Sequence, residues 1–271
     1  MVIALRWRVA AKREEPRMSP PSRVLIAFLA FLVLIEQPVQ IWAQRPPAQT
    51  ESEPGLVIIV EGIGGIDMVG KSAKLSFKHA NLPHDVHRFI WTHGTGKFLT
   101  DLQDTQHVLK KADELASFIR DYRARHPNRR IYIVAKSGGT GLTLFALRDL
   151  PANTVERVIL LSAAVSPNFD LRHALRATRG EIVSFHSRND RMILSWGTST
   201  FGTIDRHYGE SAGLKGFVVP LNQTDEDRTL YRRLVQVPYT SRMLLAGVSN
   251  GSHSATSLPW FISSEVVPWL R

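Results

Sequence analysis

Short apolar runs alternate with amphipathic segments from Gly55 to the end of the chain, and this alternation constrains the fold more than any other feature. Helical spacing is clearest from Thr100 to His126, where apolar residues recur every three or four positions and Thr100 or Asp101 is the expected cap. Nearly apolar strands separated by helices predict an α/β fold with a mostly parallel central sheet and helices on both faces. The predicted strands are "LVIIV" (56–60), "VHRFIW" (86–91), "IYIVA" (131–135), "RVILL" (157–161), "EIVSF" (181–185) and "RMLLAG" (242–247).

Composition excludes several classes of function. The net charge of +10 would suit a nucleic-acid partner, but the positive residues are scattered. Their densest cluster, "RARHPNRR" (123–130), has no zinc-finger, recognition-helix or RNA-binding motif beside it, so we expect no nucleic-acid partner. The chain has no cysteine, which excludes disulfides, thiolate catalysis and sulfur ligands. His84, His87 and His93 lack a sensible ligand set, so no metal site is expected.

The first 43 residues are predicted to be a secretory signal rather than part of the fold. An apolar run from Val24 to Ile35 follows Arg17 and Arg23, and Ala43 is a small residue at a suitable cleavage position. The run is too short for a membrane-spanning helix, which favours export to the periplasm or the medium, with an uncleaved membrane anchor as the alternative. The start codon is Met1 or Met18. Residues 44–54 are predicted to be a polar linker, and 55–271 the folded domain.

Parallel sheets of this class bind ligands beyond the carboxyl ends of their strands. The segments that follow the predicted strands are rich in glycine, serine, histidine and aspartate. They read "EGIGGID", "THGTG", "KSGGTG", "SAAVSPNFD", "HSRND" and "VSNGSH" in chain order. The basic "RHPNRR" falls at the opposite edge. One site at the carboxyl edge is therefore expected.

The segment "AKSGGTG" has the small-x-Ser-x-Gly spacing of a nucleophile elbow. Ala135, Ser137 and Gly139 occupy its three defining positions. Small residues are needed because a strand that turns abruptly into a helix brings the neighbouring backbone very close. The helix that follows directs its N-terminal amides at the site, and the N–H of Gly138 is the expected oxyanion donor. Lys136 is expected to be a solvated or rim side chain.

A serine nucleophile needs a base, and the base needs an orienting acid. Asp190 in "SRND" is the first carboxylate after the fifth predicted strand, and His253 in "NGSH" is the only histidine beyond position 207. Ser137, Asp190 and His253 thus follow successive strands in the nucleophile–acid–histidine order of an α/β-hydrolase. Asp205 and Asp225 stay open as rival acids, because the length of the preceding loop is uncertain.

From "EGIGG" to the C-terminal helix the chain resembles the α/β-hydrolase superfamily, and in particular a sparsely described group of bacterial serine hydrolases. The matching motifs are "AKSGGTG", "SPNFDL", "SRND" and "GSH", with Ala135 in place of the usual first glycine. The resemblance implies a catalytic triad of Ser137, Asp190 and His253. It also implies that the loop after the first strand supplies the second oxyanion amide, from Ile63 or its neighbours Gly62 and Gly64.

The expected activity is that of a carboxylesterase- or lipase-like hydrolase that needs no cofactor. Its expected partner is a small-molecule or lipid acyl ester, peripheral membrane association is a further option, and the oligomeric state stays open. Two alternatives are a non-catalytic binding protein of the same fold and, less favoured, a nucleotide-binding Rossmann-like enzyme suggested by the glycines of "EGIGGID". Residues 192–239 are interpreted as a partial cap. The candidate pocket residues are His93, Thr95, Trp196 and Phe201.

Overall fold

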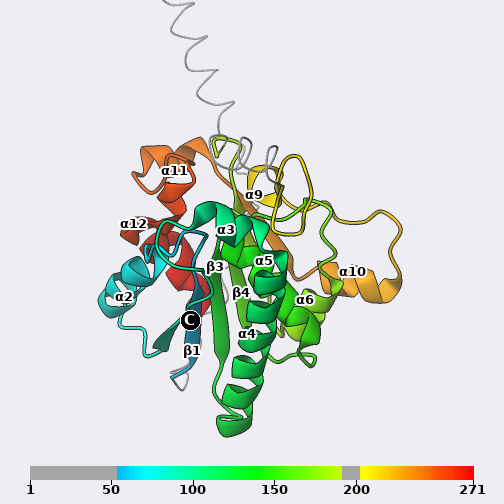
Figure 1. Cartoon of the computed structure of the whole chain (residues 1–271). Coiled ribbons are helices and arrows are strands. Elements are labelled where there is room, and N and C mark those ends of the chain that lie inside the picture. The colour runs from blue at the N-terminus through cyan, green and yellow to red at the C-terminus, as the bar shows by residue number, and fades with distance from the viewer. Residues whose placement is uncertain (1–53, 191–201) are drawn as a thin grey trace, which may run out of the picture. The chain divides into compact units, whose positions relative to one another are not determined.

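The computed structural model describes residues 54–190 and 202–271. The chain divides into two units, Met1–Gln44 and Arg45–Arg271, and the described residues belong to the second. They form a sheet of six parallel strands in the order β2-β1-β3-β4-β5-β6 (Figure 1). The strands are β1 (Leu56–Val60), β2 (Asp85–Phe89), β3 (Ile131–Lys136), β4 (Arg157–Leu161), β5 (Ile182–His186) and β6 (Leu234–Pro238). The predicted α/β class and parallel sheet are confirmed.

Helices cover both faces of this sheet, as predicted. Alternate residues of β1 and β3 point into two separate apolar clusters, because side chains along a strand alternate between the two faces. The cluster on one face includes residues of α4 (Thr105–Arg125), α5 (Gly138–Ala146) and α6 (Arg172–Ala177). The cluster on the other includes residues of α2 (Val69–His79) and of the C-terminal turns α12 (Pro259–Phe261), η3 (Ile262–Val266) and η4 (Val267–Leu270).

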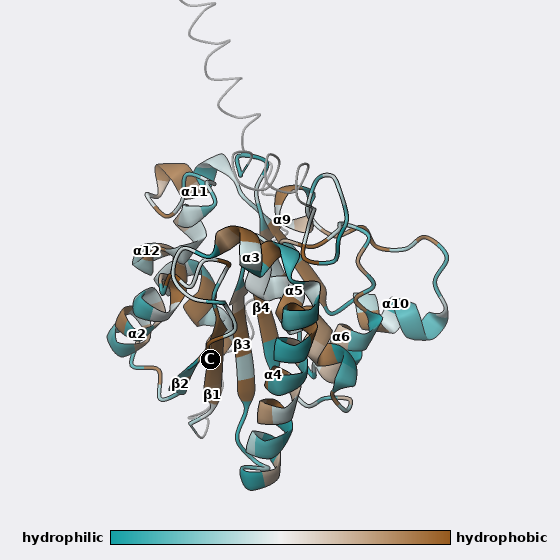
Figure 2. Cartoon of the chain, in the orientation of Figure 1, coloured by the Kyte–Doolittle hydropathy of each residue, from teal (hydrophilic) through white to brown (hydrophobic). Residues whose placement is uncertain are grey.

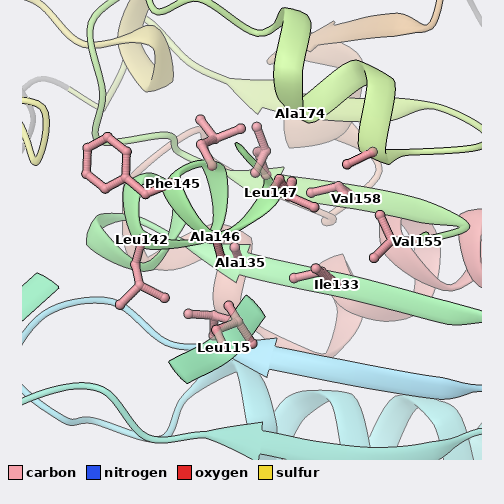
Figure 3. Packing of buried hydrophobic residues seen from close by; sticks show 14 of the residues in the cluster. Leu115, Ile133, Ala135, Leu142, Phe145, Ala146, Leu147, Val155, Val158 and Ala174 are labelled. Atoms are coloured by element: carbon pink, nitrogen blue, oxygen red, sulfur yellow. The ribbon is translucent and has the colours of Figure 1, made fainter. Parts of the chain in front are cut away.

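Strands β1 and β4 consist largely of apolar residues, whereas α4 shows both polar and apolar residues, as its amphipathic pattern requires (Figure 2). Figure 3 shows Leu115 of α4 beside Ile133 and Ala135 of β3, with Leu142 of α5 in the same cluster. All four side chains are fully buried. The remaining helical elements are α3 (Phe98–Gln103), η1 (Leu147–Asp149), α9 (Ala212–Lys215), α10 (Asp225–Tyr231), α11 (Ser241–Leu245) and η2 (Ser254–Ser257).

The prediction of the last strand at 242–247 is wrong. Strand β6 is formed by Leu234–Pro238, and the segment "SRMLL" forms helix α11 instead. Leucine, methionine and arginine are good helix formers, whereas the β-branched Val235 and Val237 suit a strand. Pro238 ends β6 at an edge strand, where a missing backbone donor is tolerated. The last strand thus lies inside the segment interpreted as a cap, which cannot include residues 234–238.

The long helix predicted from Thr100 is interrupted. Its first part belongs to α3, and Asp104 caps the start of α4 by accepting a hydrogen bond from the His107 N–H at 2.9 Å. The prediction of Thr100 or Asp101 as the cap is therefore wrong. The predicted signal at 1–43, the linker up to residue 53 and the first part of the cap lie outside the described residues. Within the described part of the chain, no helix combines the length and apolarity needed to cross a membrane.

The packing of α4 on the sheet gives a direct test of the core. Leu115→Ala should lower the free energy of unfolding by about 2–5 kcal/mol, because it leaves a cavity in place of a fully buried side chain. Leu109→Ala on the same helix is the matched control, since 43% of Leu109 is exposed and its removal should cost under about 1 kcal/mol. Denaturant unfolding measures both. Equal losses would contradict the assigned packing face.

Candidate active site

Ser137 lies at the sharp turn between β3 and α5. Its backbone has φ 50° and ψ −124°, a left-handed φ that costs a non-glycine residue about 1–3 kcal/mol. The turn is held in the sheet by a 2.9 Å hydrogen bond from the Ser137 N–H to the carbonyl of Leu161. The Ser137 carbonyl accepts a hydrogen bond from the backbone N–H of Thr140, also at 2.9 Å. This geometry is that of a nucleophile elbow.

The glycine after the serine is needed for close backbone approach. A Cβ on Gly139 would lie 2.2 Å from the carbonyl oxygen of Glu61 and 2.6 Å from that of Val60. Ala135, which pairs with Val60 and Leu160 in the sheet, is fully buried at the other small position. The first strand thus packs so tightly on the elbow that the small-x-Ser-x-Gly spacing is a steric requirement.

His253 and Asp190 form a hydrogen-bonded pair. The His253 Nδ1 lies 2.8 Å from Asp190 Oδ2, and the side chains are 14% and 1% exposed. With Nδ1–H donating to the carboxylate, Nε2 carries the lone pair that a general base needs. Burial lowers the pKa of His253, and the ammonium of Lys136 lowers it further, while the bond to Asp190 acts in the opposite direction. The imidazole is therefore neutral at neutral pH and ready to accept a proton.

The rival acids hold other positions. Asp205 accepts hydrogen bonds from the N–H of Ser166 at 3.0 and 3.2 Å and from the hydroxyl of Thr203. Asp225 lies in the first turn of α10, where its largely exposed side chain pairs with Arg228. Of the three carboxylates, Asp190 is the one hydrogen-bonded to His253.

The loop after β1 packs directly on the elbow. A Cβ on Gly62 would lie 3.2 Å from Ser137 Cβ, and a Cβ on Gly138 would lie 2.7 Å from Ile63 Cγ2. Gly138 is the first residue of α5, so its N–H has no acceptor within the helix. The N–H of Gly64 is occupied, because it donates to Asp101 Oδ2 at 2.7 Å. Gly138 and either Gly62 or Ile63 therefore remain the candidates for oxyanion donors.

Asp101 fixes this loop from the side of α3, and sequence reasoning missed that role. Its carboxylate is fully buried and accepts hydrogen bonds from the N–H of Gly64 and the N–H of His93, both at 2.7 Å. His93 Nδ1 lies 2.9 Å from the same carboxylate, and His93 Nε2 lies 3.3 Å from Asp104. Nothing in the sequence indicates a contact between residues 37 positions apart. Asp101 thus ties the loops after β1 and β2 together.

Glu61, the first residue of the same loop, is a second buried carboxyl. It accepts the N–H of Gly70 at 2.7 Å, and it lies beside Asp67. Burial is the largest cause that raises the pKa of Glu61 to about 7; the negative charge of Asp67 acts in the same direction, and the hydrogen bond from Gly70 acts against it. A proton on Glu61 would have an acceptor in the neighbouring Asp67 carboxylate, whose buried Oδ1 has no hydrogen-bond partner among the described residues. The rule that polar residues gather after strands would have indicated Glu61.

Lys136 is buried, so the prediction of a solvated or rim side chain is wrong. The residue is 5% exposed, and its ammonium donates to the backbone carbonyl of His253 at 2.7 Å and to Thr256 Oγ1 at 2.9 Å. The cause is the alternation of side chains along β3, because Lys136 lies on the same face as Tyr132 and Val134, and the C-terminal turns cover that face. Because this contact joins residues next to Ser137 and at His253, it brings the elbow and the histidine loop together.

The candidate pocket residues divide into two groups. His93 is held by Asp101 and its ring lies 3.9 Å from that of His107, while Thr95 is exposed in the loop after β2. Trp196 and Phe201 lie outside the described residues. Trp91 and Ile204, which the sequence did not single out, are buried close to Gly138.

No family model matches the chain, and no curated protein matches it. Among solved structures, a lipase-esterase related protein from Clostridium acetobutylicum aligns at a TM-score of 0.45 and 11% identity, over 82% of this chain and 96% of that one. A cutinase-like protein from Cryptococcus sp. aligns at a TM-score of 0.44 and 14% identity, over 81% of this chain and 96% of that one. A cold-adapted esterase from an Arctic intertidal metagenomic library aligns at a TM-score of 0.42 and 13% identity, over 80% of this chain and 81% of that one.

The fold assignment depends on the chain's own architecture. The six-stranded parallel order, with the elbow after β3, an acid after β5 and a histidine after β6, defines the α/β-hydrolase fold. The resemblance found in the sequence is thus confirmed at the level of the fold.

The buried Glu61 gives a prediction for stability against pH. The folded protein binds the Glu61 proton more tightly than the unfolded chain, so raising the pH from about 4.5 to about 7 should remove on the order of 2–3 kcal/mol of stability. Glu61→Gln removes this titration and keeps a donor toward Asp67. Denaturant unfolding across this range should therefore show a smaller loss in the variant. Glu114→Gln, at a half-exposed position on α4, is the charge-matched control. Parallel wild-type and Glu61→Gln profiles would contradict a protonated Glu61.

The clamp formed by Asp101 gives a second prediction. Asp101→Asn places an amide N–H₂ against one of the backbone donors, which should cost about 1–3 kcal/mol of unfolding free energy. It should also increase the rate of hydrogen exchange at the Gly64 and His93 amides, which donate to this carboxylate. Asp113→Asn, at an exposed position of α4, is the control. Unchanged exchange at both amides would contradict the role of Asp101.

Proposed function

We propose that this protein is a serine hydrolase that cleaves a carboxylic ester or a related acyl bond through a covalent acyl-enzyme. The observation that carries the proposal is the buried hydrogen bond between His253 Nδ1 and Asp190 Oδ2, in a loop joined to the strained turn of Ser137. A serine on an elbow, a neutral histidine and a buried carboxylate are the three groups that acyl transfer requires.

The first half of the reaction forms the acyl-enzyme. Ser137 Oγ attacks the carbonyl carbon while His253 Nε2 accepts the serine proton. Asp190 holds the imidazole in the tautomer that leaves Nε2 free and stabilises the positive charge that develops on the ring. The negative charge on the carbonyl oxygen meets the N–H of Gly138, at the N-terminus of α5, and an N–H of the Gly62–Ile63 segment. His253 then gives its proton to the leaving alkoxide.

The second half restores the enzyme. Water takes the place of the leaving group, and His253 Nε2 removes a proton from it as its oxygen attacks the acyl carbon. His253 then returns this proton to Ser137 Oγ as the acyl–serine bond breaks, which releases the acyl group as a carboxylic acid. The proton that left with the alcohol is thus replaced by one from water, so the cycle balances without a cofactor.

The favoured alternative is a binding protein of the same fold that performs no chemistry. It needs neither a strained serine nor a neutral histidine paired with a buried acid, and both features cost folding free energy. A nucleotide-binding enzyme is less favoured, since the glycines of "EGIGG" pack against Ser137 and Phe98.

Kinetics on p-nitrophenyl esters of graded chain length test the proposal. Wild type should show burst and turnover, Ser137→Ala should reduce turnover to the background rate, and Asp190→Asn should reduce kcat about 10⁴-fold, as in the Ser-His-Asp proteases. Asp205→Asn is the control at a rival acid and should keep kcat within a few-fold of wild type. Comparable losses in Asp205→Asn and Asp190→Asn would refute the assigned triad. Folded wild type without turnover on any ester would favour the binding protein.

A further inference from the structure

The residue before the nucleophile is a buried lysine that the mechanism above leaves without a task. The buried Lys136 ammonium donates two hydrogen bonds, one to the His253 carbonyl oxygen at 2.7 Å and one to Thr256 Oγ1 at 2.9 Å. Lysine is almost never buried to this extent without a specific partner, and a methionine would fill the same space without the desolvation cost. The ammonium group therefore calls for an explanation beyond packing.

The two acceptors belong to one short segment that carries the histidine. His253 immediately precedes the turn η2, and Thr256 Oγ1 also donates to the His253 carbonyl at 3.2 Å. The same hydroxyl lies 3.5 Å from Ser162 Oγ, on the residue that follows β4 and has a φ of 53°. Lys136 thus connects the ends of two central strands to the backbone of the histidine.

The charges around Lys136 come from three elements. The carboxylate of Asp190, after β5, and the carboxyl of Glu61, after β1, attract its positive charge when they are ionised. The imidazole of His253 lies in the loop after β6. Burial is the larger effect on the lysine and lowers its pKa to about 7. The side chain is therefore cationic below neutral pH, in the range where His253 would itself become protonated. There the two cations would share one buried environment, and among the described residues the carboxylate of Asp190 is the charge that opposes them, because Glu61 is itself protonated in that range.

We infer that Lys136 is a positioning residue, whose buried ammonium fixes the backbone of His253 beside the elbow and opposes protonation of the resting imidazole. This role rests on the proposed function, since it acts through the base that Ser137 needs. Repulsion between the two cations keeps His253 in its neutral, proton-accepting form at lower pH than the pair with Asp190 alone would allow. Above neutral pH the lysine loses its proton and this influence fades.

The test is the pH dependence of kcat/KM in Lys136→Met and Lys136→Arg. Lys136→Met keeps the length of the side chain and removes its charge and donors, so the midpoint of the acid limb should move up by roughly half to one pH unit. Lys136→Arg keeps both charge and donors and should restore the midpoint toward that of wild type. Lys74→Met, at an exposed position of α2, is the control for the loss of one surface charge. A lower kcat in Lys136→Met with an unmoved midpoint would reduce the lysine to a packing role and overturn the inference.

Titration of the His253 ring by ¹⁵N NMR separates this inference from the proposed function, because it needs no turnover. Lys136→Met should raise the midpoint of the His253 titration in the same direction as the acid limb. If wild type hydrolyses esters and the His253 midpoint is the same in both proteins, the inference fails while the function stands. If wild type is inactive and the midpoint still rises, the function fails while the electrostatic effect of Lys136 stands.

Discussion

The rest of the structure depends on the strained backbone of Ser137. A left-handed φ at a serine persists only where the surroundings hold it, and here the parallel register supplies that restraint. The Ser137 N–H is held by the carbonyl of Leu161, and the backbone at Val60 and Glu61 approaches Gly139 too closely for any side chain. The sheet therefore fixes where the serine hydroxyl lies, and the loops of the site are arranged around that point.

Two sets of buried polar groups hold the loops on either side of the serine. On one side, Asp101 and Glu61 fix the loop after β1, which we propose to be the source of the second oxyanion amide. On the other side, Lys136 and Asp190 hold the backbone and the ring of His253. Charges in a low-dielectric interior interact strongly, so each set is rigid when its partners are satisfied and costly when one is missing. Preorganised donors and acceptors of this kind are what acyl transfer uses in place of solvent.

Sequence patterns predicted the fold class well because the strands of a covered parallel sheet are almost wholly apolar. They also singled out Ser137, Asp190 and His253 as candidate site residues, since each follows a strand at the edge where ligands bind. They failed at the last strand, where the apolar composition of "RMLLAG" hid its helix-forming residues and Leu234–Pro238 had a weaker signal. Asp101 and Lys136 were missed or misread for a different reason. Their roles depend on contacts with residues that lie 37 and 117 positions away in the sequence, and no local pattern encodes such contacts.

The central claim is that Ser137 is a nucleophile activated by its surroundings. Labelling of the folded protein with a fluorophosphonate, followed by peptide mapping by mass spectrometry, tests this claim most directly, because the reagent reports the attacking atom whatever the natural substrate is. The account predicts one adduct, on the peptide that contains Ser137, and its loss when His253 is replaced by alanine. An adduct on another residue, or none on folded wild type, would contradict it.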